Sequence, residues 1–476
     1  MKNKPIIIDL DGTIVHTDML HENIFSLLAA KPLEILKIPY YLFKGKAYLK
    51  KKLALESQLD VTNLPYNYEL LDWIKDQKNK GSNVVLCTGS DIIDAKKISD
   101  FLGIFDDVIA SDGKLNLVGK NKANILVEQY GSKNFHYAGN SRKDIHIWKE
   151  SDHAIVINSS KKLLNAVKKI CKVTFTIPKR KIHPKIIIKA MRVHQWLKNL
   201  LLFAPFIAAH QINNFESWVS VTIGFISFSL CASAIYLLND LTDLSNDRSH
   251  PRKKERPFAS GELPFYYGVL LIPLLLVSSF AIAIIFSNSE FTIWLFLYLF
   301  LTTLYTFIIK PIIFLDVIVL AMLFTIRIIA GSATLLLPLS PWILGFSIFL
   351  FVSLAIIKRY AELEIQIIKN ISQIKGRGYY TSDASLIQSI GLASGFCSIL
   401  VFVLYLNSPE VMALYNSPEI IWLCIPILIY WQSWMWLSAH RGKMHDDPLI
   451  FAMKDKHSLM SGFLFVFVLF LGTVKF

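Results

Sequence analysis

The sequence predicts two domains of different fold class: an N-terminal α/β Rossmann-like domain with a helical cap, and an all-α membrane domain of nine transmembrane helices. Two patterns predict this division. Up to about residue 160, short β-rich runs alternate with helical stretches, which is typical of a doubly wound parallel sheet. From about residue 196 onward, apolar runs of roughly 18 to 22 residues follow one another, and each is long enough to cross a bilayer core of about 30 Å.

The N-terminal domain is expected to cover residues 1–160. Five short apolar runs predict its strands, namely Pro5–Ile8, Asn83–Cys87, Asp107–Ala110, Asn134–Ala138 and His153–Ile157. The segment between the first two strands, about 18–80, is mostly helical and too long for a simple crossover, so it predicts an inserted cap. Its basic stretch Lys44–Lys52 fits either a solvated helix face or contact with anionic lipid. The charged N-terminus lacks an apolar signal core, so no signal peptide is expected.

Residues 161–190 contain the basic run PKRKIHPK and predict a linker, with the domain boundary near Pro178 and the membrane domain at residues 191–476. The nine expected spans are 196–213, 215–238, 263–286, 290–309, 311–334, 339–357, 387–407, 418–437 and 457–475. Lys and Arg gather in alternate loops, and the opposite loops contain neither. The positive-inside rule therefore predicts that the N-terminal domain and the acidic loops lie in the cytoplasm. We expect the protein in a bacterial inner (plasma) membrane.

The net charge of +14 would be typical of nucleic-acid binding in a soluble protein, but here it fits the basic cytoplasmic loops of a membrane protein. We therefore expect no nucleic-acid partner. The five cysteines are scattered without metal-ligand spacing, and we interpret them as reduced packing residues.

The first predicted strand ends in the motif DLDGT, which places Asp9 and Asp11 where open α/β sheets carry their active sites. Two carboxylates at this spacing can act as a nucleophile and an acid–base group beside Mg²⁺. Later motifs add Thr88 in VVLCTGS, Lys122 in LVGKNKANIL and Asp144 in FHYAGNSRKDIHIW. This order of motifs resembles the haloacid dehalogenase-like phosphatases.

That resemblance implies that Asp9 is phosphorylated and Asp11 protonates the leaving group, while Thr88 and Lys122 hold the phosphate. It also implies an Mg²⁺ site, with metal ligands from Asp9, Asp11 and Asp144. The usual GD of the last motif is replaced by Gly139–Asn140, so Asp144 must carry the negative charge there. Two interpretations remain: an active phosphatase, or a family fold kept for docking or regulation.

The second span ends in an Asp-rich segment, residues 236–263, with the sequence YLLNDLTDLSNDRSHPRKKERPFASGEL. This segment contains Asn239, Asp240, Asp243 and Asp247. Spacings of three and four place the three Asp side chains on one face of a helix that continues past the membrane edge. Three carboxylates on one face repel each other unless cations neutralise them, as two Mg²⁺ ions bridging a diphosphate would. The flanking cations can clamp phosphate oxygens: Arg248, Arg252, Lys253, Lys254 and Arg256. The alternative is a solvated loop of mixed charge.

The pattern NDxxDxxxD at this position resembles the UbiA superfamily of intramembrane prenyltransferases, and the resemblance covers about residues 185–476. Further matches are Tyr305, Lys310, Asp316, Arg327 and Gly331. A charged residue inside a span is a functional candidate, although Arg327 can also simply pair with a carboxylate.

The second loop has IIKRYAELEIQ in place of the DxxxD of aromatic prenyltransferases. Three motifs resemble the branch typified by decaprenyl-phosphate phosphoribosyltransferase: this one, RVHQWLKN and RGKMHDDPLIFAMKDKHSL. In RVHQWLKN, Val193 takes the place of the usual Pro. The substrate-binding candidates on these motifs, on the Asp-rich segment and after the fourth span are Asn239, Arg192, Lys198, Arg256, Lys310, Lys358, Arg359, Tyr360, Glu362, Arg441, Lys443 and Asp447.

Phosphoribosyl pyrophosphate is the donor in this branch, and a polyprenyl phosphate lipid is the acceptor. The resemblance implies Mg²⁺ on Asp240, Asp243 and Asp247, and attack of the lipid phosphate on the anomeric carbon. Lys198 and Arg192 are expected to hold the lipid phosphate. Side chains expected near a second metal or the ribose hydroxyls are Glu362, Asp446 and Asp447, although Asp446 fits structural loop pairing equally well.

The fusion suggests two consecutive steps, in which the N-terminal phosphatase removes the 5-phosphate from the lipid product. Two other functions remain open. One is a prenyltransferase that moves a prenyl group from prenyl diphosphate to a small aromatic acceptor. The other is a transporter or scaffold with a fused phosphatase, against which the clustering of charged motifs on one membrane side argues.

Overall fold

The computed structural model describes the whole chain except residues 1–3, 369, 373–376, 445–446 and 475–476. The chain folds into two compact units. The first comprises Met1–Met191 and Tyr236–Ile272, and the second comprises Arg192–Ile235 and Pro273–Phe476. The Asp-rich segment thus belongs to the same unit as the N-terminal domain.

A parallel six-stranded sheet forms the centre of the first unit, in the order β3-β2-β1-β4-β5-β6. Its strands are β1 Ile6–Ile8, β2 Val84–Asp91, β3 Asp107–Ser111, β4 His136–Gly139, β5 His153–Ser159 and β6 Lys172–Pro178. In β1, Ile7 pairs with Val85 on one side and with Tyr137 on the other. The central strand is buried on both faces, as expected of a doubly wound sheet, and the predicted α/β class is confirmed.

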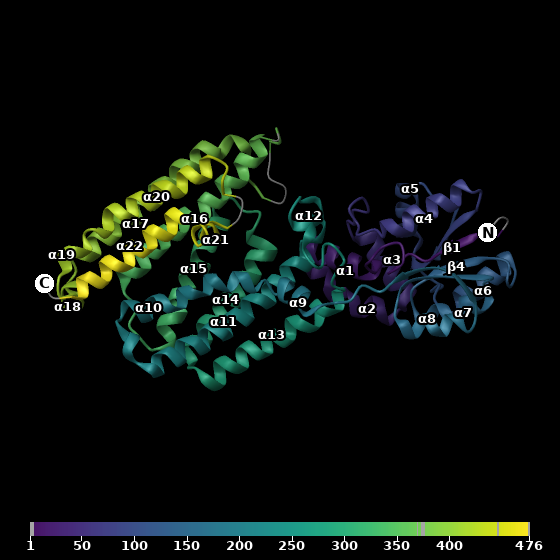
Figure 1. Cartoon of the computed structure of the whole chain (residues 1–476), viewed down its shortest axis with the longest axis horizontal. Coiled ribbons are helices and arrows are strands. Elements are labelled where there is room, and N and C mark those ends of the chain that lie inside the picture. The colour runs from purple at the N-terminus through teal and green to yellow at the C-terminus, as the bar shows by residue number, and fades with distance from the viewer. Residues whose placement is uncertain (1–3, 369, 373–376, 445–446, 475–476) are drawn as a thin grey trace. The chain divides into compact units, whose positions relative to one another are not determined.

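Helices cover both faces of this sheet (Figure 1). The face containing Ile6 and Ile8 packs against α4 Tyr68–Asn79 and α5 Ile92–Leu102. The opposite face packs against three further helices, α6 Lys120–Tyr130, α7 Ile145–Glu150 and α8 Lys161–Lys168.

Both α8 and β6 lie in the segment interpreted above as a basic linker. The β6 strand is an edge strand in which exposed and half-buried residues alternate, so it has no continuous apolar run. The sheet therefore extends to Pro178, where the sequence predicted the domain boundary, and α9 Pro184–Ala190 follows.

The segment after β1 forms a helical cap. Its helices are α1 Met19–Ala30, η1 Pro32–Lys37, α2 Ile38–Phe43 and α3 Lys46–Glu56. They enclose a small apolar cluster of their own, made by Leu27, Tyr41, Leu49 and Leu53. The last helix of the predicted cap, α4, instead packs on the sheet.

Within the described residues, eight helices are long and apolar enough to cross a membrane, which indicates an integral membrane protein. They are α11 Phe215–Thr242, α13 Phe265–Phe286, α14 with the π-helical turn η6 at Ser289–Ile309, α15 Leu315–Thr334, α16 Pro341–Ile368, η7 and α17 at Thr381–Leu406, α19 and α20 at Pro418–His440, and α22 Lys456–Thr473. Shorter helices connect them, namely α12 Leu244–Ser249, η5 Lys253–Glu255, α18 Pro409–Leu414 and α21 Pro448–Ala452.

The ninth predicted helix, 196–213, is not confirmed. This stretch contains η3 Val193–Leu202, α10 Phe203–Ala208 and η4 Gln211–Asn213. Polar side chains hold it against α11, because Trp196 Nε1 donates to Ser233 Oγ at 2.9 Å and Asn199 Nδ2 donates to Ser229 Oγ at 2.9 Å. The apolar residues of this stretch predicted a membrane span, but hydropathy does not reveal its side-chain hydrogen bonds. These bonds hold an irregular segment that packs on α11.

Candidate functional site

Residues of the first candidate site lie together at the carboxyl end of β1. The Lys122 ammonium, on α6, lies 2.7 Å from Asp9 Oδ1 and also donates to the Cys87 carbonyl at 3.0 Å. Lys122 is only 3% exposed and Asp9 is 8% exposed. Burial raises the pKa of Asp9 to about 6, although the positive charge of Lys122 opposes this shift.

Asp11 is fixed by three donors. Its Oδ1 accepts from the Met19 backbone N–H at 2.8 Å, at the start of α1. Its Oδ2 accepts from Ser90 Oγ at 2.7 Å and from Thr88 Oγ1 at 3.4 Å. Burial and the charges of Asp18 and Asp9 raise the pKa of Asp11 to about 7, so this carboxyl can hold a proton near neutral pH. Ser90 was not among the predicted residues, although the motif VVLCTGS contains it.

Asp144 of the last motif, predicted as an Mg²⁺ ligand, makes its described hydrogen bonds within the protein. Asp144 Oδ2 accepts from the backbone N–H groups of Asn140 and Ser141 at 3.0 and 2.8 Å, and its Oδ1 accepts from Tyr137. Asp144 therefore closes the turn after β4. The Asn140 Nδ2 donates to the Asp11 carbonyl at 3.0 Å, and Gly12 makes room for it, since a Cβ there would lie 2.0 Å from this nitrogen. The amide of Asn140, which replaces the usual Asp of this motif, thus donates a hydrogen bond to the Asp11 main chain.

The cap contributes one cation that the sequence did not single out. Lys50, on α3, donates to the Gly89 carbonyl at 2.5 Å and to Asn116 Oδ1 at 3.1 Å. It lies in the basic stretch Lys44–Lys52, which the sequence interpreted as a helix face. Burial lowers its pKa, and the charges of Asp11 and Asp18 oppose this change. Lys50 therefore brings a positive charge from the cap to the end of β2.

The Asp-rich segment forms the second site. Asp240 lies on the last turn of α11 and Asp247 on α12, and both are buried. A single nitrogen, Arg256 Nη1, lies 3.1 Å from Asp240 Oδ1 and 2.6 Å from Asp247 Oδ2. Burial raises the pKa of Asp247 to about 6 despite Arg256, so this site favours additional positive charge.

The predicted continuous helix is interrupted at Asp243, which lies between α11 and α12. Helical hydrogen bonds nevertheless cross the interruption, because the Asp243 N–H donates to the Asn239 carbonyl at 2.9 Å and the Asp247 N–H donates to the Asp243 carbonyl at 2.8 Å. Asn239 and Asp243 are half-buried.

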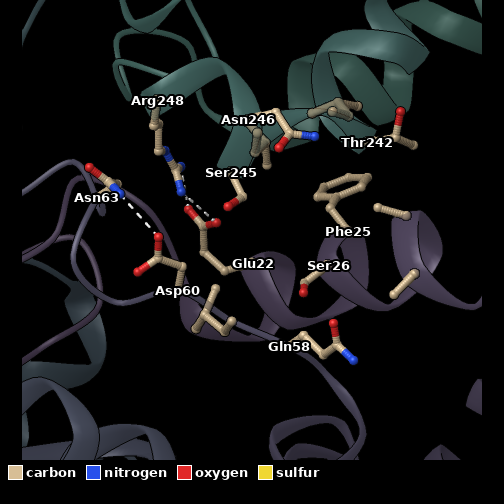
Figure 2. A pocket seen from close by; sticks show the side chains of 15 residues that line it. Glu22, Phe25, Ser26, Gln58, Asp60, Asn63, Thr242, Ser245, Asn246 and Arg248 are labelled. Atoms are coloured by element: carbon tan, nitrogen blue, oxygen red, sulfur yellow. Dashed lines mark hydrogen bonds and ion pairs between the residues drawn. The ribbon is translucent and has the colours of Figure 1, made fainter. Parts of the chain in front are cut away.

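Arg248, one of the cations that the sequence suggested for clamping phosphate oxygens, pairs with a carboxylate of the cap. Its guanidinium is buried against Glu22 of α1, with Nη1–Oε2 at 3.0 Å and Nη2–Oε1 at 2.7 Å. A pocket of about 240 Å³ lies beside this pair, lined by α1, residues 58–63 and the segment 241–248 (Figure 2).

Two predicted lysines of the second unit meet at one carboxylate. Lys198 Nζ lies 2.7 Å and Lys358 Nζ 3.3 Å from Asp447 Oδ2, although the three residues are far apart in sequence. The two ammonium groups hold the pKa of Asp447 well below its usual range, against the effect of burial. Asp446 lies outside the described residues.

A buried charge network lies around Asp316. Its Oδ2 is 3.1 Å from Arg359 Nε and 3.2 Å from Arg377 Nη1, and its Oδ1 accepts from Tyr379 at 2.6 Å. Glu362 pairs with both arginines. Arg359 and Glu362 lie on α16, which continues past the predicted end of its span, so the expected loop motif KRYAE is helical. Arg377 and Tyr379 were not predicted to take part in the site.

The other candidates are dispersed in the structure. The Tyr360 hydroxyl lies 2.9 Å from His440 Nδ1, Arg441 and Lys443 are exposed, and Lys310 follows the π-helical turn η6. Arg192 has a left-handed backbone, with φ 51°.

Arg327 is held by neutral groups. Its Nε donates to Asn199 Oδ1 at 2.9 Å, and its guanidinium carbon lies 5.0 Å from the centre of the Tyr298 ring. Its Nη1 also donates to the Leu323 carbonyl and its Nη2 to the Tyr298 hydroxyl, so these described hydrogen bonds are to neutral groups rather than to the carboxylate that the sequence suggested.

A further group of potential metal ligands, His136, Asp152 and His153, lies at the opposite end of the sheet from Asp9. The Lys4 ammonium is 3.0 Å from Asp152 Oδ2, so this carboxylate already has a cationic partner. We assign no metal to this group.

Comparison with known proteins gives one family and several relatives. The sequence pattern of the UbiA prenyltransferase family matches residues 200–454. The protein y4nM of Sinorhizobium fredii is 35% identical over 96% of this chain and 89% of its own length. The nodulation protein NoeC of Azorhizobium caulinodans is 34% identical over 57% of this chain and 88% of its own length.

Decaprenyl-phosphate phosphoribosyltransferase of Mycolicibacterium smegmatis is 37% identical over 38% of this chain, and the match spans 57% of that relative. Among solved structures, a UbiA homologue from Archaeoglobus fulgidus bound to GPP and Mg²⁺ is 16% identical, with a TM-score of 0.45, and covers 61% of this chain and all of its own. A substrate-bound phosphoserine phosphatase is 22% identical, with a TM-score of 0.27, and covers 36% of this chain and 93% of its own.

Proposed function

Because this chain belongs to the UbiA prenyltransferase family, we propose that its membrane domain is an Mg²⁺-dependent transferase that moves phosphoribose from phosphoribosyl pyrophosphate to a polyprenyl phosphate. The relatives named decaprenyl-phosphate phosphoribosyltransferase support this donor and acceptor. The observation that carries the proposal is the pair of lysines on Asp447, because a lipid acceptor with a phosphate head group needs cations.

The Asp-rich segment supports a diphosphate site. Two buried carboxylates share Arg256, and Asp243 lies between them in the chain. Carboxylate oxygens are the ligands that Mg²⁺ prefers. Burial raises the pKa of Asp247 despite Arg256, and a further cation beside this carboxylate would oppose that shift. The residues present therefore fit the metal. We propose that Asp240, Asp243 and Asp247 would hold Mg²⁺, which would neutralise the diphosphate as it departs.

The lysine pair supports an acceptor site. Both ammonium groups contact the same oxygen of Asp447, so a lipid phosphate can compete with this carboxylate for two cations. Lys198 also lies 5.6 Å from the centre of the Phe324 ring. We infer that Lys198 and Lys358 bind the lipid phosphate and that Asp447 holds them in place when the lipid is absent.

The proposed transfer forms one bond and breaks one. An oxygen of the lipid phosphate bonds to the anomeric carbon of ribose, and the bond from that carbon to the diphosphate breaks. Arg256 stabilises the negative charge that accumulates on the diphosphate, which is where electrostatic stabilisation accelerates such a reaction most.

The N-terminal domain is proposed to be a phosphatase that removes the 5-phosphate from the transferred group. Asp9 is the nucleophile, oriented by Lys122, and Asp11 donates a proton to the departing ribose oxygen. Water then hydrolyses the aspartyl phosphate, and Asp11 takes up the proton released. Oxygen ligands for Mg²⁺ are available from the Asp9 carboxylate and the Asp11 carbonyl, with the Asn140 side chain beside them.

Removal of phosphate is tested in the Asp9→Asn variant of the full-length, detergent-purified protein. With polyprenyl phosphate and phosphoribosyl pyrophosphate labelled in both ribose and the 5-phosphate, the wild type gives a lipid that carries ribose label without phosphate label. Asp9→Asn is expected to retain both labels. An unchanged rate of phosphate loss would contradict the phosphatase assignment.

The orientation of the charged loops supports a place in a bacterial inner membrane with both sites on the cytoplasmic side. The soluble donor, phosphoribosyl pyrophosphate, would then be available on the side of the membrane that the sites face. Protease cleavage after the helix α9 in inside-out vesicles, but not in sealed cells, is the result that this orientation predicts.

A further inference from the structure

One buried ion pair joins the cap of the N-terminal domain to the Asp-rich segment. Glu22 lies in the first turn of α1 and is 2% exposed, and Arg248 lies on α12 and is 9% exposed. The two side chains point toward one another and form two parallel contacts at 3.0 and 2.7 Å (Figure 2). A bidentate pair of this kind fixes the orientation of the guanidinium as well as its distance.

Arg248 also makes a third contact, which closes the loop that follows. Its Nε donates to the Ala259 carbonyl at 3.0 Å. Within the same loop, Arg256 pairs with Asp247, the residue next to Arg248. Arg248 is therefore connected to the loop that carries Arg256 and is the chain neighbour of Asp247.

The ion pair contributes little to holding the two segments together. Removing both charges from water costs free energy that their attraction offsets only in part, so buried pairs are poor stabilisers. Apolar contacts already dock the segments, because the rings of Phe25 and Phe265 lie 5.3 Å apart. Beside the ion pair, the pocket leaves α1 and α12 incompletely packed. The pair is better suited to setting geometry than to stabilising the fold.

The same helix reaches the phosphatase site. The Met19 N–H at the start of α1 donates to Asp11 Oδ1 at 2.8 Å, and Glu22 follows within one turn. The helix α1 thus connects Asp11, through the Met19 N–H, with the Glu22–Arg248 pair, and Asp247 is the chain neighbour of Arg248.

We propose that Glu22, a residue of the N-terminal domain, is a positioning residue of the membrane transferase, which acts through Arg248 to hold Asp247 and Arg256 in the geometry that binds a magnesium diphosphate. This inference rests on the proposed function of the Asp-rich site. The cap is thereby part of the transferase, and the fused domain serves the first reaction as well as the second.

The test measures binding of inorganic pyrophosphate with Mg²⁺ to the full-length protein in detergent, by calorimetry. Outer partners of metal ligands typically change metal affinity about 10- to 100-fold when removed. Glu22→Gln is therefore expected to raise the Kd for magnesium pyrophosphate about tenfold. Glu56→Gln is the matched control, because this cap residue bonds with Tyr41 inside the cap, and its Kd is expected to stay within twofold of wild type.

A double-mutant cycle separates positioning from direct phosphate contact. If Arg248 acts only with Glu22, the variants Arg248→Gln and Glu22→Gln/Arg248→Gln raise the Kd no further than Glu22→Gln does. Glu22→Asp keeps the negative charge but shortens the side chain by one methylene. Its Kd for magnesium pyrophosphate is expected to rise less than that of Glu22→Gln. This milder variant also preserves the test if Glu22→Gln does not fold.

A merely structural role would lower the melting temperature of Glu22→Gln and Glu22→Asp and leave the Kd of the folded protein unchanged. That result would overturn the positioning role of Glu22 but not the proposed donor site, because the wild type would still bind magnesium pyrophosphate. Absence of magnesium pyrophosphate binding in the wild type would overturn the proposed donor site and this inference with it.

Discussion

Arg256 Nη1 lies 2.6 Å from Asp247 Oδ2, and the same nitrogen contacts Asp240 Oδ1 at 3.1 Å. One guanidinium thus joins two buried carboxylates from two different helices, α11 and α12. The sequence places these residues in a single charged segment, but the structure shows that Arg256 is an integral part of the acidic site rather than a separate clamp beside it.

Arg256→Gln is expected to lower kcat/KM for phosphoribosyl pyrophosphate about 100-fold, because it removes a charge-assisted contact to the diphosphate and leaves two carboxylates without this partner. The measurement is the initial rate of ribose transfer at varied donor concentration. Arg252→Gln is the control, since Arg252 is exposed on the same segment. An equal fall in kcat/KM in the two variants would show that only the total charge of the segment matters.

Lys198→Met is expected to raise KM for polyprenyl phosphate about tenfold and to leave KM for phosphoribosyl pyrophosphate nearly unchanged, because the lysine pair is assigned to the acceptor. Initial rates at varied lipid and fixed donor test this. Lys456→Met, which removes an exposed lysine at the start of α22, controls for the loss of surface charge. A rise in KM for the donor instead would reassign Lys198 to the diphosphate.

The phosphatase activity is expected to fall as the pH rises through about 7. Burial and two neighbouring carboxylates raise the pKa of Asp11 to about 7, and Asp11 must carry its proton to act as the acid. Activity that needs this proton is therefore lost as the pH rises above this pKa. It also falls below about pH 6, because burial raises the pKa of Asp9 to about 6 and Asp9 must be ionised to act as the nucleophile. Asp18→Asn removes one of the neighbouring charges, so the loss should begin at lower pH. Phosphate release from a small phosphomonoester, measured from about pH 5 to 9, would show this shift or refute it.

Gly331→Ala is expected to destabilise the second unit by about 1–3 kcal/mol, since a Cβ on α15 would lie 2.0 Å from the Leu202 carbonyl oxygen. Thermal unfolding of the protein in detergent measures this. Gly462→Ala on α22 is the matched control, because no heavy atom of the described residues outside its own helix lies within 4 Å of the added carbon. A melting temperature that falls equally in both variants would contradict the close packing of η3 on α15.

Much of the fold follows from local sequence patterns. Five of the six strands and eight of the nine proposed spans coincide with predicted apolar runs, because burial on both faces of a sheet, or in lipid, demands continuous apolar sequence. The β6 strand and the 196–213 segment do not satisfy this condition. One is an exposed edge, and the other depends on side-chain hydrogen bonds from Trp196 and Asn199.

Residues of the candidate sites could be predicted where one short motif contains them, as with Asp9 and Asp11 just after β1 or with Asp240 and Asp247 in the Asp-rich segment. Partners that come from distant segments carry no such signal. The Glu22–Arg248 pair and the Asp316–Arg377 pair depend on how separate elements pack, and charge complementarity alone does not select them among many Lys, Arg, Asp and Glu residues. Asn140 shows the opposite case, in which a visible departure from a motif turned out to contact Asp11.

The most direct test of the central claim is transfer of ribose label from phosphoribosyl pyrophosphate into the lipid phase by the full-length protein with Mg²⁺ and polyprenyl phosphate. We predict transfer by the wild type and a loss of at least about 100-fold in Asp243→Asn, whose carboxylate is proposed to hold Mg²⁺. No transfer by the wild type, together with transfer of a prenyl group from prenyl diphosphate to a small acceptor, would contradict the phosphoribosyl account.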